Sequence, residues 1–349
     1  MVWTFCKNYH DYSSVCSVYV EDSLQFIREG NGKRNIEKSI EEEMMNRSLT
    51  EKLKIYETLR IPYFSGFWYR FMSKIEMRSI EKEQITEYPL NQEDREEVIT
   101  VSLTSFPARI EYTHYAIKTL MLQTYKPDRI VLWLAEEQFP KKNLPEQLLE
   151  LKKYGLEIKW TKDYSSYKKF IHVVEEQKKN ELVITFDDDI LYPPKCIERL
   201  IKKHKEYPSC LICERAQAIN YAEDKLYNPG KWDIISKIGI KEPSYSLCHS
   251  SGGGCLIPYG AFYQDAAIEE KFTKLASKND DIWYMFMCVQ NDTKIIKTRK
   301  YHKIFTVVTG SQVVQLATEN VQQNKSVEIM HKLIEAYPKA WERILGEGK

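Results

Sequence analysis

The sequence predicts an α/β fold, with a mostly parallel β-sheet flanked by helices and a helical N-terminal appendage. Three observations support this fold class. Short apolar runs at 98–106, 130–134, 156–160 and 183–186 alternate with segments of helical periodicity. Several of these runs end in polar or acidic residues. The intervening helices also fit the crossover connections that parallel strands require.

The chain has 349 residues, a length typical of about two domains. We predict a mainly helical N-terminal extension over 1–96, an α/β domain over 97–325 and a C-terminal helix over 326–349. Lys and Arg total 51 against 50 for Asp and Glu, so nothing indicates a nucleic-acid partner. Neither a signal pattern nor an apolar run of spanning length occurs, and the scattered cysteines fit reduced thiols. These features favour a cytoplasmic protein.

The N-terminal extension contains an aromatic segment rich in basic residues. A helix is predicted to begin near Pro62, with an apolar stripe that includes Phe64, Trp68 and Phe71. This stripe has two interpretations. It packs on the following domain, or it makes peripheral contact with a membrane surface through residues 60–78.

The first three strands of the α/β domain end in residues suited to binding a nucleotide. The strand at 98–106 ends in Thr104 and Ser105, and Arg109 is placed where the next helix begins. Asp163 follows the strand at 156–160, and Lys169 lies in a helix predicted over 167–178. The Gly-rich dinucleotide fingerprint and the Walker phosphate loop are both absent, so a nucleotide is held in another way.

The fourth strand, at 183–186, leads directly into Asp187, Asp188 and Asp189. Three adjacent carboxylates repel one another unless positive charge lies beside them. Because hard divalent cations prefer carboxylate oxygens, the cluster predicts an Mg²⁺ or Mn²⁺ site at the carboxyl edge of the sheet. The alternative is a solvated acidic turn.

Two further motifs follow. The stretch 210–219 is predicted to be one strand, and Gly252, Gly253 and Gly254 permit a ligand to approach the backbone closely. Asp280 and Asp281 begin a helix, where acids also serve simply as capping residues.

In combination, these motifs resemble bacterial family 2-like glycosyltransferases of the GT-A fold, of the kind that builds capsular polysaccharide and lipopolysaccharide. The likeness covers about 97–325 and is carried by TSFPARI, QTYKPDRIVLWL, SSYKKF, VITFDDDILYP, GGGCLIP and NDDIW. It implies a nucleoside-diphosphate sugar as donor, with a UDP-sugar favoured. It also implies a divalent cation and a glycan or lipid-linked acceptor. The basic aromatic segment would hold the protein at the inner face of the cell membrane, where lipid-linked acceptors are expected.

The resemblance also assigns roles to individual residues. The metal would be held by Asp187 and Asp189, with His302 as an additional ligand, and Asp188 would lie near the ribose or sugar. Asp281 would be the catalytic base. The acceptor would meet Gly253, Gly254, Asp280 and Trp283. The later acidic motif is usually Glu-Asp in this family, so Asp280 is shorter than the usual first acid.

Two other classes of protein share these features. A metal-dependent nucleotidyltransferase also uses clustered carboxylates, but the segment TSFPAR lacks the glycine-rich and basic signature expected after its first strand. The other class is a non-catalytic sugar-binding module on the same fold. Because one fold supports many functions, the choice depends on the chemistry of the site.

Overall fold

The computed structural model describes residues 66–222, 225–226, 232–233, 236–299, 305–311 and 325–347. They belong to one compact unit, Gly66–Lys349. The helices predicted before residue 66 and the candidate ligand His302 lie outside the described residues.

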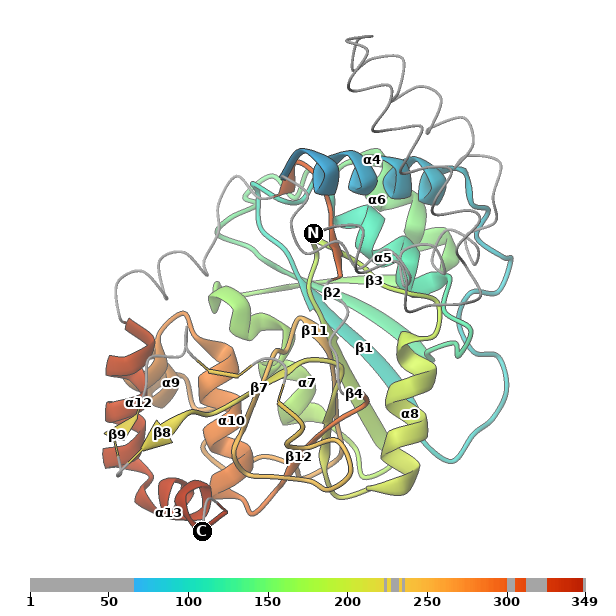
Figure 1. Cartoon of the computed structure of the whole chain (residues 1–349). Helices are drawn as coiled ribbons and strands as arrows, with labels where there is room; N and C mark the ends of the chain where they lie inside the picture. The colour runs from blue at the N-terminus through green and yellow to red at the C-terminus, as the bar shows by residue number, and fades with distance from the viewer. Residues whose placement is uncertain are drawn as a thin grey trace, which may run out of the picture. The chain divides into compact units, whose positions relative to one another are not determined.

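A seven-stranded sheet forms the centre of this unit and confirms the predicted fold class (Figure 1). Its strand order is β12-β6-β11-β4-β1-β2-β3, and β11 alone runs antiparallel to its neighbours β4 and β6. All other neighbouring pairs are parallel. The strands are β1 (Val98–Thr104), β2 (Arg129–Ala135), β3 (Leu156–Thr161), β4 (Glu181–Phe186), β6 (Leu211–Cys213), β11 (Gly253–Ile257) and β12 (Ile295–Lys297).

Helices cover both faces of the sheet, which explains why its strands are apolar on both sides. One core contains Val131, Trp133 and Val183 together with residues of α7, α9, α10, α12 and α13. Residues of opposite parity, such as Leu132 and Ile184, pack in a second core with α5, α6 and α8. The helices are α5 (Thr113–Met121), α6 (Glu146–Glu150), α7 (Ile171–Glu176), α8 (Cys196–Glu206), α9 (Glu269–Ala276), α10 (Asp280–Gln290), α12 (Lys325–Ala336) and α13 (Pro338–Gly346).

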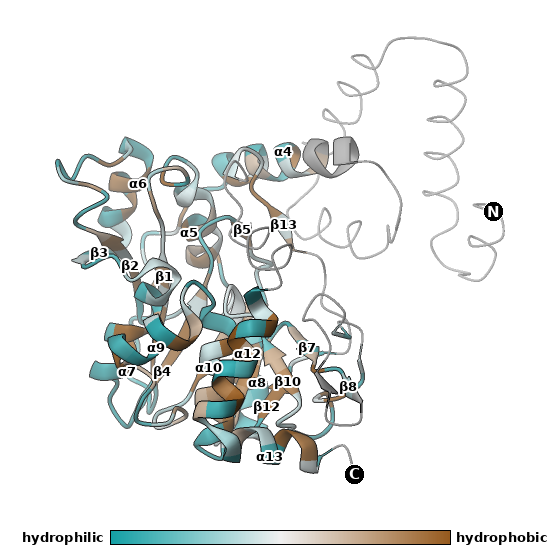
Figure 2. Cartoon of the chain, turned by 90° about the vertical axis from the view of Figure 1, so that its left-hand side faces the viewer, coloured by the Kyte–Doolittle hydropathy of each residue, from teal (hydrophilic) through white to brown (hydrophobic). Residues whose placement is uncertain are grey.

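The C-terminal segment forms two helices where the sequence predicts one. Pro338 occupies the first turn of α13, a position that suits proline, and so separates α13 from α12. Both helices carry hydrophilic and hydrophobic residues (Figure 2), and their apolar residues pack in the same core as α10.

Three other predicted elements differ from the structure. The helix expected at Arg109 begins only at Thr113, because the backbone N–H groups of Arg109 and Ile110 both bond to Phe106 O in a tight turn. The helix predicted over 167–178 is divided into a 3-10 turn, η3 (Ser165–Lys169), and α7. The strand predicted over 210–219 breaks after Cys213. It continues as β7 (Ala216–Ala218), which pairs with β10 (Leu247–His249) outside the main sheet.

The helix α4 (Gly66–Lys82) carries the end of the aromatic segment. Met72, Ile75 and Ile80 are buried, and Ser73 Oγ donates to Val307 O at 2.7 Å. Packing on the α/β domain is therefore observed for one face of residues 72–80, whereas Lys74 and Arg78 are exposed. Among the described residues, no helix combines the length and apolar character that crossing a bilayer requires.

Candidate active site

The acidic motif after β4 meets positive charge from two separate segments. Arg109 Nη1 lies 3.1 Å from Asp188 Oδ1 and 2.9 Å from Asp189 Oδ2. Lys169 Nζ lies 2.7 Å from Asp187 Oδ1. Ser105, at the end of β1, donates to Asp188 Oδ2. Two side chains therefore supply the compensating charge that the sequence led us to expect from a cation.

The three carboxylates differ in their access to solvent. The Asp187 side chain is 38% exposed, whereas those of Asp188 and Asp189 are 4% and 9% exposed. Burial raises the pKa of Asp188, and the positive charge of Arg109 acts against this increase. Asp187 is therefore the acid of this motif that can most readily meet a ligand.

Lys169 connects the acidic motif with the second acidic pair. Its Nζ is 3.4 Å from Asp280 Oδ2, and the side chain is almost completely buried. Although burial disfavours its charge, the carboxylates of Asp187, Asp280 and Asp281 raise the pKa of Lys169. A permanent positive charge thus lies between two acidic groups that are about ninety residues apart in the sequence.

Asp280 and Asp281 begin α10, and the Asn279 side chain caps this helix by accepting from Ile282 N at 3.2 Å. Asp280 is buried and accepts from Ser166 Oγ at 2.7 Å and Ser251 Oγ at 2.9 Å. Asp281 is half-buried, and its Oδ1 accepts from Ser251 N at 2.8 Å. Capping therefore falls to Asn279, and both acids are directed to other segments.

The two carboxylates of this pair have opposite pKa shifts. Burial acts to raise the pKa of Asp280, but Lys169 and the two serine hydroxyls lower it overall. Burial and the negative charge of Asp280 raise the pKa of Asp281 to about 7. Neighbouring titratable groups that are shifted in opposite directions are typical of acid–base sites.

A glycine loop joins these groups. Tyr192 OH accepts from Asp187 N at 2.8 Å and donates to Gly252 O at 2.6 Å. A Cβ at Gly252 would lie 1.7 Å from Asp187 Oδ2. Gly254 has φ +97°, a conformation that favours glycine, and a Cβ there would lie 2.9 Å from the Phe186 ring. The glycines thus allow the loop to pass directly over the end of β4.

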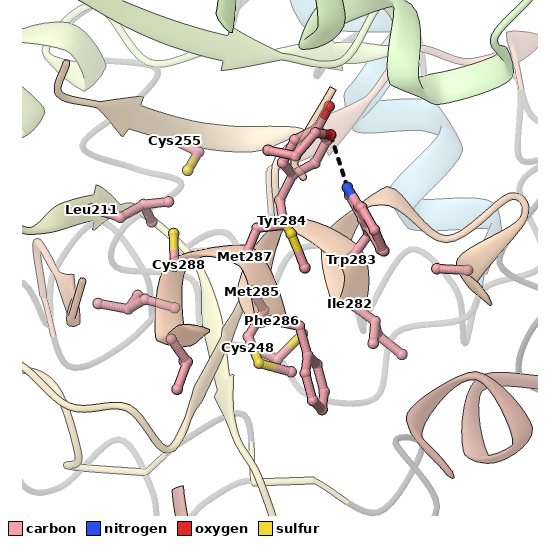
Figure 3. Close-up of a cluster of buried hydrophobic side chains, with 14 of the residues drawn as sticks. Leu211, Cys248, Cys255, Ile282, Trp283, Tyr284, Met285, Phe286, Met287 and Cys288 are labelled. Carbon is pink, nitrogen blue, oxygen red and sulfur yellow. Dashed lines mark hydrogen bonds between the residues drawn. The ribbon is translucent and has the colours of Figure 1, made fainter. Parts of the chain in front are cut away.

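Other predicted site residues lie in different surroundings. Thr104 Oγ1 donates to Trp133 O at 2.8 Å within the sheet. Asp163 forms a separate group, accepting from Lys168 Nζ at 2.9 Å and from Gln138 Nε2 at 2.7 Å. Trp283 is fully buried among the side chains of α10 (Figure 3), and its indole N–H donates to Ala266 O at 2.9 Å.

Several residues of this site were not identified from the sequence. Ser166, Tyr192, Ser251 and Arg215 all lie beside the acidic groups or the glycine loop. Lone serines and tyrosines carry no motif. Arg215 was hidden inside a stretch that the sequence predicted to be one continuous strand.

The acidic motif suits a divalent cation by its chemistry. The described residues contain no preassembled group of three or more His, Cys, Asp or Glu side chains able to hold a metal. However, Mg²⁺ is commonly bound through one or two carboxylates together with substrate phosphates. Asp187 and Asp189 provide two such carboxylates. A cation that binds Asp189 Oδ2 must displace Arg109, which contacts this oxygen at 2.9 Å.

Comparison with known proteins finds no matching protein family and no matching curated protein. Solved structures with a similar fold include 4-diphosphocytidyl-2C-methyl-D-erythritol synthase from Anaerococcus prevotii. It has 12% identity and a TM-score of 0.39, covering 66% of this chain and 96% of that one. Another is a mannosyltransferase from Pyrobaculum calidifontis in complex with GDP-Man and Mn²⁺. It has 10% identity and a TM-score of 0.37, covering 81% of this chain and 83% of that one. These likenesses do not decide between the two classes of enzyme.

Gly252→Ala is expected to disturb the acidic motif selectively. The new Cβ would lie 1.7 Å from Asp187 Oδ2, so the carboxylate that contacts Lys169 or the loop itself must shift. We expect a loss of roughly 1–3 kcal/mol in the free energy of unfolding, as for other overpacked sites. Thermal unfolding measures the loss. Gly346→Ala is the matched control, because a Cβ there meets nothing within 4 Å. Equal stability of the two variants would contradict the close approach of the loop to Asp187.

Proposed function

We propose that this protein is a metal-dependent glycosyltransferase. It would move a sugar from a nucleoside-diphosphate sugar, with UDP-sugars favoured, to a glycan or lipid-linked acceptor. One observation carries the proposal: Lys169 joins Asp187 of the acidic motif to Asp280, the neighbour of the base-like carboxylate Asp281. Asp281 is half-buried, and its raised pKa suits a group that exchanges protons near neutral pH.

The residues around the acidic motif suit the departure of a diphosphate. Negative charge grows on this group as the sugar leaves through an oxocarbenium-like state. Arg109 and Lys169 are cations that can donate charge-assisted hydrogen bonds to its oxygens. When bound, a divalent cation held by Asp187 and Asp189 supplies Lewis-acid stabilisation of the same charge.

The second acidic pair suits activation of the acceptor. Asp281 would take the proton of the attacking hydroxyl, while the Ser251 N–H holds its Oδ1 in place at 2.8 Å. Asp280 would stay ionised beside Lys169 and so keep the pKa of Asp281 high. A base that acts from the face opposite the leaving group supports inversion at the sugar carbon.

The cellular setting is also part of the proposal. The resemblance of the motifs favours bacterial capsular polysaccharide or lipopolysaccharide synthesis in the cytoplasm. Contact with the inner face of the membrane through residues 60–78 stays a prediction. Because Met72, Ile75 and Ile80 of α4 are buried, the apolar part of the membrane alternative rests on residues 60–71.

A test of the proposal follows donor hydrolysis without an acceptor. UDP- and GDP-sugars are incubated with and without Mn²⁺ or Mg²⁺, and free sugar and nucleoside diphosphate are measured. We expect slow release of both products, dependent on the cation. Asp189→Ala should lose the cation-stimulated release while the protein remains folded, because the substitution takes away one carboxylate of the proposed metal site. Glu206→Ala, at an exposed pair with Lys203, is the control and should behave as the wild type.

The rival classes give different results in this assay and in a parallel assay that contains a nucleoside triphosphate and a sugar phosphate. A nucleotidyltransferase would release pyrophosphate from a nucleoside triphosphate and a sugar phosphate, and would leave nucleotide sugars intact. A sugar-binding module would bind without turnover. Either outcome, or unchanged metal dependence in Asp189→Ala, would overturn the proposed function or its metal assignment.

A further inference from the structure

Arg215 lies where the chain leaves the main sheet, between β6 and β7. The glycine loop is fixed to this break by two backbone hydrogen bonds. Ser250 N donates to Arg215 O at 2.9 Å, and Glu214 N donates to Gly254 O at 3.0 Å. The backbone at Arg215 is therefore attached to the loop that passes over the acidic motif.

The glycine loop separates Arg215 from Asp187. A Cβ at Gly253 would lie 2.8 Å from Arg215 Cδ, just as a Cβ at Gly252 would meet the Asp187 carboxylate. The stem of Arg215 thus rests on one glycine of the loop and the exposed acid of the motif rests on the next. Glycine at 253 keeps this space open for the arginine.

Among the residues that the structure describes, no acidic side chain pairs with Arg215, unlike the other cations near the site. Arg109 and Lys169 pair with the acidic motif, and Arg199 and Arg299 each lie 2.9 Å from Glu214 Oε2. Within the part of the chain that the structure describes, Arg215 is half-buried and its guanidinium meets only the Phe305 ring, at 5.8 Å. The guanidinium nitrogens are not sealed from solvent, so the five N–H donors can meet an anion that enters the site.

We infer that Arg215 binds a phosphoryl group of the substrate. The inference rests on the proposed function, because it extends that site across the glycine loop. The planar guanidinium matches the oxygens of a phosphoryl group in a bidentate manner. Arg215 and Asp187 contact neighbouring glycines of the loop, so Arg215 lies near the proposed position of the donor diphosphate. The phosphoryl group belongs either to that diphosphate or to the phosphate of a lipid-linked acceptor.

Calorimetry of three variants tests the inference, with UDP, GDP, pyrophosphate and octyl phosphate as probes. Arg215→Gln should weaken binding of at least one probe by about 10- to 100-fold, the usual effect of removing a hydrogen bond to a charged group. Arg215→Lys should recover part of this affinity because it keeps the charge. Gly253→Ala keeps the arginine, but the new Cβ presses on its side-chain carbons. We therefore expect a smaller loss of affinity for the same probe.

The controls separate this inference from the proposed function. Arg129→Gln removes the same charge at the first residue of β2, which lies at the amino end of the strand, away from the site. Arg129 pairs there with Glu157, and the variant should keep every affinity unchanged. Weaker UDP, GDP or pyrophosphate binding in Arg215→Gln assigns the arginine to the diphosphate, and weaker octyl phosphate binding alone assigns it to the acceptor. Wild-type affinity of Arg215→Gln for all four probes overturns the inference, as does absence of binding to the wild type. Phosphate binding without nucleotide binding would instead overturn the proposed function and leave Arg215 as a phosphoryl site.

Discussion

Asp281→Asn is expected to lower turnover by about 10²- to 10⁴-fold, the usual contribution of a general base. Asparagine keeps the size of the side chain and can still accept the Ser251 N–H bond, but it cannot take a proton. Donor affinity should change little, because binding and proton removal are separate interactions. The measurement is initial-rate kinetics at saturating donor, with donor affinity from calorimetry. A fall in donor affinity that matches the fall in rate would move Asp281 into the donor site.

The pH dependence of the wild type provides a second test of the same residue. Only ionised Asp281 can accept a proton, so turnover should rise with pH through an apparent pKa near 7. Asp280→Asn removes the neighbouring negative charge that helps to raise this pKa. We therefore expect its pH profile to move to lower pH.

Stability should change in the opposite direction from activity. The folded-state pKa of Asp281 lies above its ordinary value of 3.8. Its contribution to stability is therefore fully present below pH 3.8 and is lost as pH rises through about 7. Because asparagine does not ionise, Asp281→Asn should be more stable than the wild type above neutral pH. A less active variant that is also less stable at pH 8 would indicate general damage to the site.

Lys169→Met is expected to destabilise the protein by about 3–5 kcal/mol at neutral pH, the usual cost of removing one partner from a buried ion pair. Methionine fills most of the space of the lysine stem but leaves Asp187 and Asp280 without their cation. The loss of stability should become smaller as pH falls, because these carboxylates can then be protonated. Denaturant unfolding at several pH values measures both effects.

Lys168→Met is the matched control for this substitution. Lys168 is equally buried and belongs to the same 3-10 turn, but its partner Asp163 is 36% exposed and retains contact with water. We expect a smaller loss of stability. Because Lys168 helps to lower the pKa of Asp163, this loss should also shrink at acid pH, but by less than for Lys169. Equal losses for the two lysines would show that Lys169 has no special role between the acidic groups.

The strands and the order of the site motifs could be predicted from the sequence because both are local patterns. Apolar runs such as 183–186 are buried on both faces of the sheet, and the acids that follow them lie at its carboxyl edge. Arg109 was correctly placed near that edge, although it lies in a tight turn and not at a helix start.

The partners of these residues could not be predicted because they come from distant parts of the chain. Arg109 meets Asp188 across 79 positions, and Ser166 meets Asp280 across 114. No periodicity indicates which serine will bond to which acid. The sequence also gave no sign that Arg109 and Lys169 would neutralise the acidic motif, since that depends on how β1, η3 and β4 are brought together.

The position of β11 in the sheet also has a consequence for how the protein folds during synthesis. This antiparallel strand lies between β4 and β6, although it follows both in the chain. On the ribosome, β4 and β6 therefore emerge before the strand that pairs with the facing edge of each. Long-range pairing of this kind is slow, and exposed strand edges favour aggregation. A nascent chain that stalls before residue 253 should therefore depend strongly on chaperones, whereas one from which residue 257 has emerged can join β4 to β6 through β11.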